Sequence, residues 1–220
     1  MNDTIYSSRF IKKSDPQNSE FIFELPDYWW SRAYEYEWAA GFAQKEDISL
    51  DAACGIERPL KFYLLDNCSE VYACDIDPRI EDKSKIIEGI ESTFGEAAAK
   101  NLPSRYSEGV NYARANLTKL PYESNKFDKV YCISVLEHLP PEAVKSAFDE
   151  FRRVLKDDGM IILTFDFPAI NLELLGGLIK ESGLKFAEEA DYKLPEDALY
   201  TTMWGGLYCF RAVLFKEAGI

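Results

Sequence analysis

The chain has 220 residues, and 38 acidic against 25 basic side chains give it a formal net charge of −13 at pH 7. Apolar residues make up 47% of it, which is enough for one domain with a hydrophobic core and too many for a disordered chain. The negative charge argues against a nucleic-acid partner, because a polyanion is repelled by an acidic surface.

The sequence offers little for a membrane, for export or for a metal. No segment reaches the ~20 consecutive apolar residues of a membrane helix, and residues 1–20 have no apolar export signal. We therefore expect a cytoplasmic protein without a membrane partner. The five cysteines lack CxxC spacing and His138 is the single histidine, so we expect reduced thiols and no metal site.

Helical and strand patterns alternate along most of the chain. Residues 1–20 are polar and aperiodic, which predicts an N-terminal polar arm that is loosely docked. Helical spacing of large side chains predicts a helix over 26–43, and a long apolar stripe predicts another from Pro141 to just before Gly159. Short apolar runs predict strands at 48–52, 70–74, 110–114, 127–134 and 160–165.

The order of these elements predicts the fold. Strands that alternate with helices form a parallel sheet covered on both faces. Two further strands, at 184–190 and 206–215, have no helix between them and should pair as an antiparallel hairpin. We expect an α/β fold: a doubly wound, mostly parallel seven-stranded sheet with an antiparallel C-terminal edge hairpin and helices on both faces.

A single domain over 21–220 accounts for all of these elements. The passage from Asp75 to Asn116 is longer than the ~30 residues that a strand-helix-strand unit needs. We place the excess in a helical insertion around 86–108.

The candidate site residues follow directly after the strands, where ligands bind in such sheets. Small side chains in the first loop let a ligand approach the backbone, and an acid after the second strand can accept hydrogen bonds from both ribose hydroxyls. An amide after the third strand can pair with an adenine edge. In chain order, the residues are Asp51-Ala52-Ala53-Cys54-Gly55, Asp75, Asn116 and Ile133-Ser134.

Taken in order, these motifs resemble the class I S-adenosylmethionine-dependent methyltransferases. The resemblance covers roughly residues 26–216 and depends on the order of the set, since each motif alone is weak. The matching segments are LDAACG (50–55), YACDID (72–77), ANLTKLPYESNKFDKVY (115–131), SVLEHL (134–139) and FRRVLKDDGMIIL (151–163).

The resemblance implies S-adenosylmethionine as cofactor, S-adenosylhomocysteine as product and a role for each loop. Asp51 would bind the methionine amino group, and the loop of Ala52, Ala53, Cys54 and Gly55 would run along the methionine moiety. Arg32 would meet the methionine carboxylate, with Tyr34 or Tyr36 alongside.

The later loops would hold the nucleoside. Asp75 would hold the ribose, and Ile76 would pack on the adenine. Asn116 and Leu117 would meet the adenine edge, and Ile133 and Ser134 would lie near the sulfonium.

Two positions depart from the family pattern. Ala53 stands where the family usually has its first glycine, which is tolerable if Ala53 has a negative φ. Glu57 replaces another glycine; it must point outward or pair with Arg58, and we place it in the first turn of the next helix, facing solvent.

The sequence does not identify a catalytic residue. His138, Glu137 and Asp166 are weak candidates: His138 more often anchors a helix start, Asp166 could instead cap a helix at Ala169, and Ser134 replaces the acid of a related metal motif. The Trp29-Trp30 pair and Trp204 could pack in the core or line an acceptor pocket.

We therefore expect a methyltransferase that acts on a small-molecule acceptor. The alternative, motivated by Ala53 and Glu57, is a methyltransferase-like fold that has lost catalysis and serves as a binding or scaffold protein.

Overall fold

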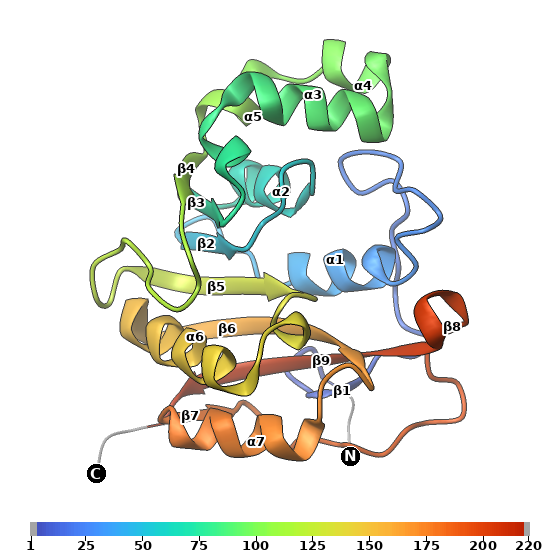
Figure 1. The fold of residues 1–220 in the computed structure, drawn as a ribbon, viewed down its shortest axis with the longest axis vertical. Coiled ribbons are helices and arrows are strands. Elements are labelled where there is room, and N and C mark those ends of the chain that lie inside the picture. The colour runs from blue at the N-terminus through green and yellow to red at the C-terminus, as the bar shows by residue number, and fades with distance from the viewer. Residues whose placement is uncertain (1–3, 218–220) are drawn as a thin grey trace.

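The computed structural model describes residues 4–217, which form one mixed sheet with helices on both faces (Figure 1). Five parallel strands lie in the order β6-β5-β2-β3-β4, and β9 continues the sheet antiparallel to β6. The bounds of these strands are β2 (Ile48–Ala52), β3 (Glu70–Asp75), β4 (Asn111–Arg114), β5 (Phe127–Ile133), β6 (Leu155–Phe167) and β9 (Leu207–Lys216). The doubly wound, mostly parallel α/β fold predicted from the sequence is confirmed.

The outer edge of β9 carries three short strands instead of one. The predicted antiparallel partner is present as β7 (Leu184–Phe186), and two further strands, β1 (Arg9–Phe10) and β8 (Tyr200–Thr201), pair with β9 as well. β9 has ten residues, so three short segments fit along it one after another. The sheet therefore has nine strands rather than the expected seven.

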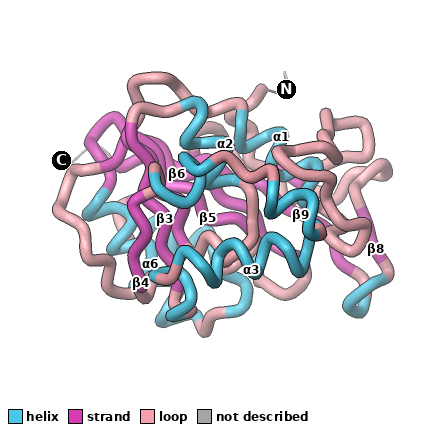
Figure 2. The backbone as a smooth tube through the Cα atoms, turned by 90° about the horizontal axis from the view of Figure 1, so that it is seen from above, coloured by secondary structure: helices cyan, strands magenta, loops and turns pink. Residues whose placement is uncertain are grey.

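Strand side chains alternate between two hydrophobic cores, because successive residues of a strand point to opposite faces. On β5, Val130 and Cys132 belong to the core under α6 (Pro141–Val154) and α7 (Leu172–Glu181), whereas Tyr131 belongs to the core on the opposite face. Helices flank the strands in the view from above (Figure 2). The opposite core contains residues of α1 (Arg32–Ala40), α2 (Leu60–Asn67) and α3 (Lys83–Phe94).

The segment expected to hold a helical insertion contains most of α3 and two short helices, α4 (Glu96–Lys100) and α5 (Ser104–Glu108). Three 3₁₀ turns complete the secondary structure: η1 (Pro78–Glu81), η2 (Leu136–His138) and η3 (Met203–Gly205).

Two predicted helices are shorter than expected. The first starts at Arg32, because residues 26–31 form turns in which the Trp29 amide donates to the Pro26 carbonyl. The second ends at Val154 and β6 begins at once, so Gly159 lies inside a strand. A Cβ at Gly159 would lie 2.9 Å from the Asp128 carbonyl oxygen, which explains the glycine there.

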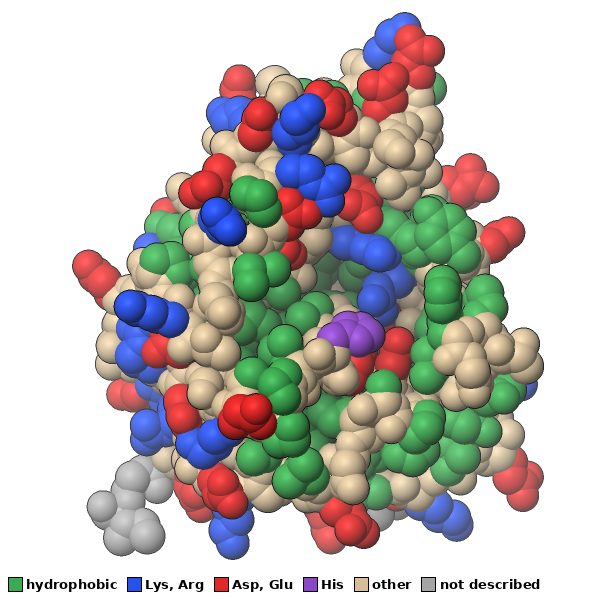
Figure 3. All heavy atoms as spheres, viewed as in Figure 1, with side chains coloured by type: hydrophobic (Ala, Val, Ile, Leu, Met, Phe, Trp, Pro, Cys, Tyr) green, Lys and Arg blue, Asp and Glu red, His purple; other side chains and the backbone are tan. Residues whose placement is uncertain are grey.

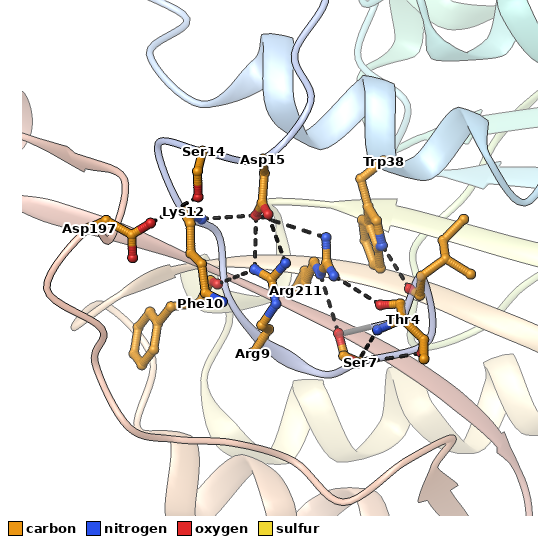
Figure 4. Close-up of polar contacts among 11 residues, drawn as sticks. Thr4, Ser7, Arg9, Phe10, Lys12, Ser14, Asp15, Trp38, Asp197 and Arg211 are labelled. Carbon is orange, nitrogen blue, oxygen red and sulfur yellow. Dashed lines mark hydrogen bonds and ion pairs between the residues drawn. The ribbon is translucent and has the colours of Figure 1, made fainter. Parts of the chain in front are cut away.

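The N-terminal segment is held more firmly than its polar sequence suggests. Phe10 and Ile11 are each 1% exposed, and β1 pairs with β9. Figure 4 shows the contacts that hold the segment: Arg9 donates to both oxygens of Asp15 at 2.8 and 2.7 Å, and Arg211 on β9 donates to backbone carbonyls. The expected loosely docked arm is thus an additional edge of the sheet over part of its length.

No helix within residues 4–217 has the length and apolar character needed to cross a membrane.

We predict that Phe10→Ala lowers the free energy of unfolding by about 3–5 kcal/mol, because it empties a closely packed site in the core. Urea denaturation measures the change. The control is Leu194→Ala at a side chain that is 41% exposed, which should change stability by less than about 0.5 kcal/mol. Equal, small effects of both substitutions would contradict the docking of this segment.

Candidate active site

A cavity of about 190 Å³ opens at the carboxyl ends of β2 and β5. It is lined by Arg32 and Tyr36 of α1, by Asp51, by residues 53–55, by Arg58 and by Ile133 and Ser134. Figure 3 shows a hollow in the middle of this face of the molecule, with basic side chains inside it and hydrophobic side chains around it. We call the cavity the strand-end cleft. Most of the residues expected along the methionine moiety line it, whereas Ala52 is fully buried in the sheet.

Two residues of the loop after β2 have a left-handed backbone conformation. Ala53 has φ +55° and Gly55 has φ +63°. The condition under which Ala53 would be tolerable, a negative φ, is therefore not met, and its side chain costs about 1–2 kcal/mol in this conformation. At Gly55 a Cβ would lie 2.6 Å from Cγ of Arg58, so this position requires its glycine.

Two polar side chains hold the loop in this shape. Asp75, at the end of β3, accepts a hydrogen bond from the Gly55 amide at 2.9 Å. Lys61 is fully buried, and its Nζ donates to the carbonyls of Gly55 at 2.9 Å and Arg58 at 2.6 Å. Lys61 is not among the residues predicted from the sequence, although a lysine within the apolar run of residues 60–65 was the available signal.

Glu57 lies before the helix and not in its first turn. α2 starts at Leu60, and Oε1 of Glu57 lies 3.6 Å from Nε of Arg58. The expectation of a helical Glu57 is therefore wrong, while its other condition, a pairing with Arg58, is met. The Arg58 guanidinium also lies 3.6 Å from the centre of the Trp29 ring, which fixes it at the cleft wall.

Asp51 places an unusual carboxyl group in the cleft. It is 3% exposed, and its Oδ2 has no hydrogen-bond partner among the described residues. Burial raises the pKa of Asp51 to about 7; the positive charge of Lys61 opposes this shift and the negative charge of Asp75 adds to it. A cationic group in the cleft would satisfy this carboxyl group.

The residues expected to hold the ribose and the adenine are not among the lining residues of the cleft. The second oxygen of Asp75 accepts from the Asp77 amide at 2.9 Å, and lone pairs on both oxygens stay available. Ile76, the next residue, is 63% exposed. Asn116 is exposed with its Oδ1 bonded to Thr118, and Leu117 is buried.

A buried carboxylate joins the first helix to the strand ends. Glu35 is fully buried, forms an ion pair with Arg32, and accepts hydrogen bonds from the hydroxyls of Ser31 at 3.1 Å and Ser134 at 2.5 Å. Burial acts to raise the pKa of Glu35, but the Arg32 charge and the hydroxyl donors together hold it below its usual value. Glu35 is therefore ionised and holds Arg32 in position.

A second cavity, of about 430 Å³, adjoins the cleft and shares Arg32 and Arg58 with it. We call it the aromatic cavity because its other lining residues include Trp29, Trp30 and Trp204, together with His138 and Asp166. Of the tryptophans that could either pack or line a pocket, Trp29 is buried in a core cluster and Trp30 packs against another, yet both also line this cavity together with the exposed Trp204. Tyr36 faces the strand-end cleft, whereas Tyr34 lines a different cavity.

Two of the catalytic candidates are acids with a buried oxygen atom: Glu137 is buried and Asp166 is half-buried. Glu137 is 9% exposed, and its Oε1 accepts from the Asp166 amide at 2.9 Å. Burial raises the pKa of Glu137 to about 8, and that of Asp166 to about 6, where the negative Glu35 adds to the shift. Oε2 of Glu137 and Oδ1 of Asp166 have no partner among residues 4–217.

The alternative role of Asp166, as the cap of a helix at Ala169, is wrong. Asp166 lies near the end of β6, and Asn171 caps α7 instead, accepting from the Leu174 amide at 3.0 Å. His138 is exposed at the edge of the aromatic cavity. Within the described residues, no group of three or more His, Cys, Asp or Glu side chains is placed to hold a metal ion.

We predict that Glu35→Ala costs about 3–5 kcal/mol of unfolding free energy, because it leaves the Arg32 charge uncompensated in a buried site. Chemical denaturation measures this loss. The matched control is Glu37→Ala on the same helix at a partly exposed side chain, with an expected change within about 0.5 kcal/mol. A loss for Glu35→Ala no larger than that for the control would show that the buried pair does not hold α1.

We predict that Asp51→Asn stabilises the folded protein, relative to the wild type, more at pH 8 than at pH 5. The folded state keeps the Asp51 proton up to about pH 7, whereas the unfolded chain loses it near pH ~4, so the wild type loses stability as the pH rises through this window. The variant lacks this loss. Its free energy of unfolding, relative to that of the wild type, should therefore rise by ~2 kcal/mol from pH 5 to pH 8. Urea denaturation at both pH values measures the difference, and a pH-independent difference would contradict the raised pKa.

The comparison with known families supports the assignment of the motifs. Residues 50–163, just over half of the chain, match the family model described as a methyltransferase domain. The matched segment runs from the middle of β2 into β6, and therefore includes the loop after β2, Asp75, Ser134 and Glu137.

Solved structures with the same fold cover most of the chain. A TehB-like S-adenosylmethionine-dependent methyltransferase from Corynebacterium glutamicum is 17% identical, with a TM-score of 0.58 over 83% of this chain and 86% of that one. An S-adenosylmethionine-dependent methyltransferase from Methanosarcina mazei is also 17% identical, with a TM-score of 0.57 over 82% of this chain and 97% of that one. At these identities the likeness shows the fold alone.

Curated relatives match over shorter stretches. An uncharacterised protein from Haemophilus influenzae is 38% identical over 79 residues, which are 34% of this chain and 32% of the relative. One from Methanocaldococcus jannaschii is 40% identical over 63 residues, which are 29% of this chain and 27% of the relative. The chain thus spans about a third or less of these relatives. On the family match and the fold, the chain belongs to the methyltransferase domain family, of the class I S-adenosylmethionine-dependent type.

Proposed function

We propose that this protein transfers a methyl group from S-adenosylmethionine to a small-molecule acceptor. The observation that carries the proposal is the meeting of two loops at the strand ends, where Asp75 holds the Gly55 amide and retains acceptor capacity. A vicinal diol can bind to this carboxylate, and the exposed Ile76 beside it offers an apolar surface for a base.

The cleft residues fit the amino-acid end of the cofactor. Oδ2 of Asp51 has no partner among the described residues, and an ammonium group would supply one. Arg32 is already bound to Glu35, whereas the ionic partner of Arg58 among the described residues is Glu57, at 3.6 Å. We therefore assign the methionine carboxylate to Arg58, with Arg32 as the fixed positive charge behind it.

The chain's own contribution to catalysis is alignment. The bound cofactor supplies a methyl group on a positively charged sulfur, which is reactive enough that no strong base is required. Ser134, held by Glu35, forms the cleft wall at the end of β5, and the aromatic cavity opens next to it. A substrate in that cavity would be held against the cleft with water excluded, which supplies proximity and orientation.

We predict that S-adenosylmethionine and S-adenosylhomocysteine raise the melting temperature of the protein, and that Asp75→Asn reduces the affinity for both at least ~10-fold through the lost ribose hydrogen bonds. Thermal melting and calorimetry measure these effects. The matched control is Asp77→Asn, because Asp77 is two residues away and pairs with Arg79 on the surface. Its affinity should stay within ~2-fold of wild type.

The alternative, a binding or scaffold protein with the same fold, gives a different result. A protein that binds both nucleosides, yet releases no S-adenosylhomocysteine with any acceptor in a metabolite screen, would support that alternative. The absence of any melting shift with either nucleoside at millimolar concentration would contradict the cofactor assignment itself.

A further inference from the structure

The aromatic cavity is built from parts of the chain that are far apart in sequence. Trp29 and Trp30 come from the turns before α1, and Trp204 comes from η3 near the C-terminus. Three of the four tryptophans of the chain thus line one cavity of about 430 Å³, a size that suits a small organic ligand. Indole rings offer broad flat surfaces on which a planar ligand can stack.

Two aromatic rings at this cavity are exposed to solvent. Trp204 is 74% exposed and Tyr28 is 56% exposed. Trp204 also has φ +59°, and Gly205 and Gly206 follow with φ +89° and +92°. Strained backbone that presents a large apolar side chain to water has a cost that a covering ligand would offset.

The inner part of the cavity carries polar groups. Asp166 lines it, and Oδ1 of Asp166 is buried without a hydrogen-bond partner among residues 4–217. Arg32 and Arg58 line this cavity and the strand-end cleft alike, so they mark the wall that the two cavities share. A group of the acceptor that donates a hydrogen bond to Asp166 would therefore lie toward the wall that this cavity shares with the strand-end cleft, where we place the cofactor.

The charges in the cavity favour a hydroxyl group over an amine as that donor. Arg32, Arg58 and His138 are basic, and Asp166 is the one acid among the lining residues. An acceptor that arrives as an ammonium ion would meet the Arg58 guanidinium and also Arg32, whose charge Glu35 compensates in part. A hydroxyl oxygen that gains negative charge as it loses its proton would be stabilised by the same arginines.

Resting on the proposed function, we propose that the acceptor is a planar aromatic alcohol that binds in the aromatic cavity against the exposed ring of Trp204, with its hydroxyl group on Asp166. In the transfer, a lone pair of the hydroxyl oxygen forms the new bond to the methyl carbon. The carbon–sulfur bond breaks with its electron pair moving to sulfur, and the hydroxyl proton goes to the Asp166 carboxylate. The products are the aryl methyl ether, the neutral thioether and protonated Asp166.

Binding is tested separately from chemistry. Protein labelled with 5-fluorotryptophan gives one ¹⁹F signal for each of its four tryptophans, and Trp38, which lines another cavity, is the internal control. The probes are 4-ethylphenol, 4-ethylaniline and 4-ethylcyclohexanol. We expect 4-ethylphenol to shift the signals of Trp29, Trp30 and Trp204 but not that of Trp38, and 4-ethylcyclohexanol to shift none.

Chemistry is followed as release of S-adenosylhomocysteine with the same probes. We expect turnover with 4-ethylphenol, a loss of at least ~100-fold in Asp166→Asn with phenol affinity kept within ~3-fold, and ~10-fold weaker binding in Trp204→Ala. Trp204→Phe should restore most of the affinity because it keeps an aromatic face.

The outcomes separate this inference from the proposed function. If the nucleosides bind but 4-ethylphenol shifts no tryptophan signal, or if 4-ethylaniline is methylated as fast as 4-ethylphenol, the aromatic-alcohol assignment is overturned and the methyltransferase assignment stands. If neither nucleoside raises the melting temperature, the proposed function fails first. Full turnover in Asp166→Asn would likewise remove the role given to Asp166.

Discussion

The carboxylate of Glu35 is the interaction on which the arrangement of the site depends. It is fully buried, and it binds Arg32 and Ser31 on its own side and Ser134 at the end of β5. A charge in such a place is tolerated only when several donors surround it. Because the donors come from α1 and from the sheet, their shared acceptor fixes the helix over the strand ends, and with it the wall between the two cavities.

The loop after β2 shows how a segment with one glycine, Gly55, can still make a tight turn at the end of a strand. Ala53 takes a left-handed conformation that glycine would adopt without strain, and the surrounding contacts maintain it. Lys61 donates hydrogen bonds to two carbonyls of the loop. Asp75, on the neighbouring strand, accepts a hydrogen bond from the Gly55 amide. The departures from the family pattern, Ala53 and Glu57, therefore change the contacts that hold the loop. They change the path of its backbone along the strand ends much less.

The sequence was sufficient for the features that depend on local pattern. β2 occupies the predicted residues, and the residues after each parallel strand meet at one edge because parallel strands end on the same side of a sheet. The structure places Asp51, the Gly55 loop and Ser134 around one cleft for this reason.

The sequence did not predict contacts between segments that are far apart in the chain. The position of Trp29 over Arg58, the burial of Lys61 and the pairing of β1 with β9 depend on tertiary packing, which no periodicity encodes. The length of the first helix was overestimated for a related reason. Trp30 stands at helical spacing from Tyr34 and Trp38, yet it lies in a turn and lines the aromatic cavity.

The most direct test of this cofactor site is a crystal structure of the protein with S-adenosylhomocysteine bound. We expect both ribose hydroxyls within hydrogen-bond distance of the Asp75 carboxylate, the amino group facing Asp51 and the carboxylate group on Arg58. A nucleoside bound elsewhere, or a ribose that makes no contact with Asp75, would contradict it.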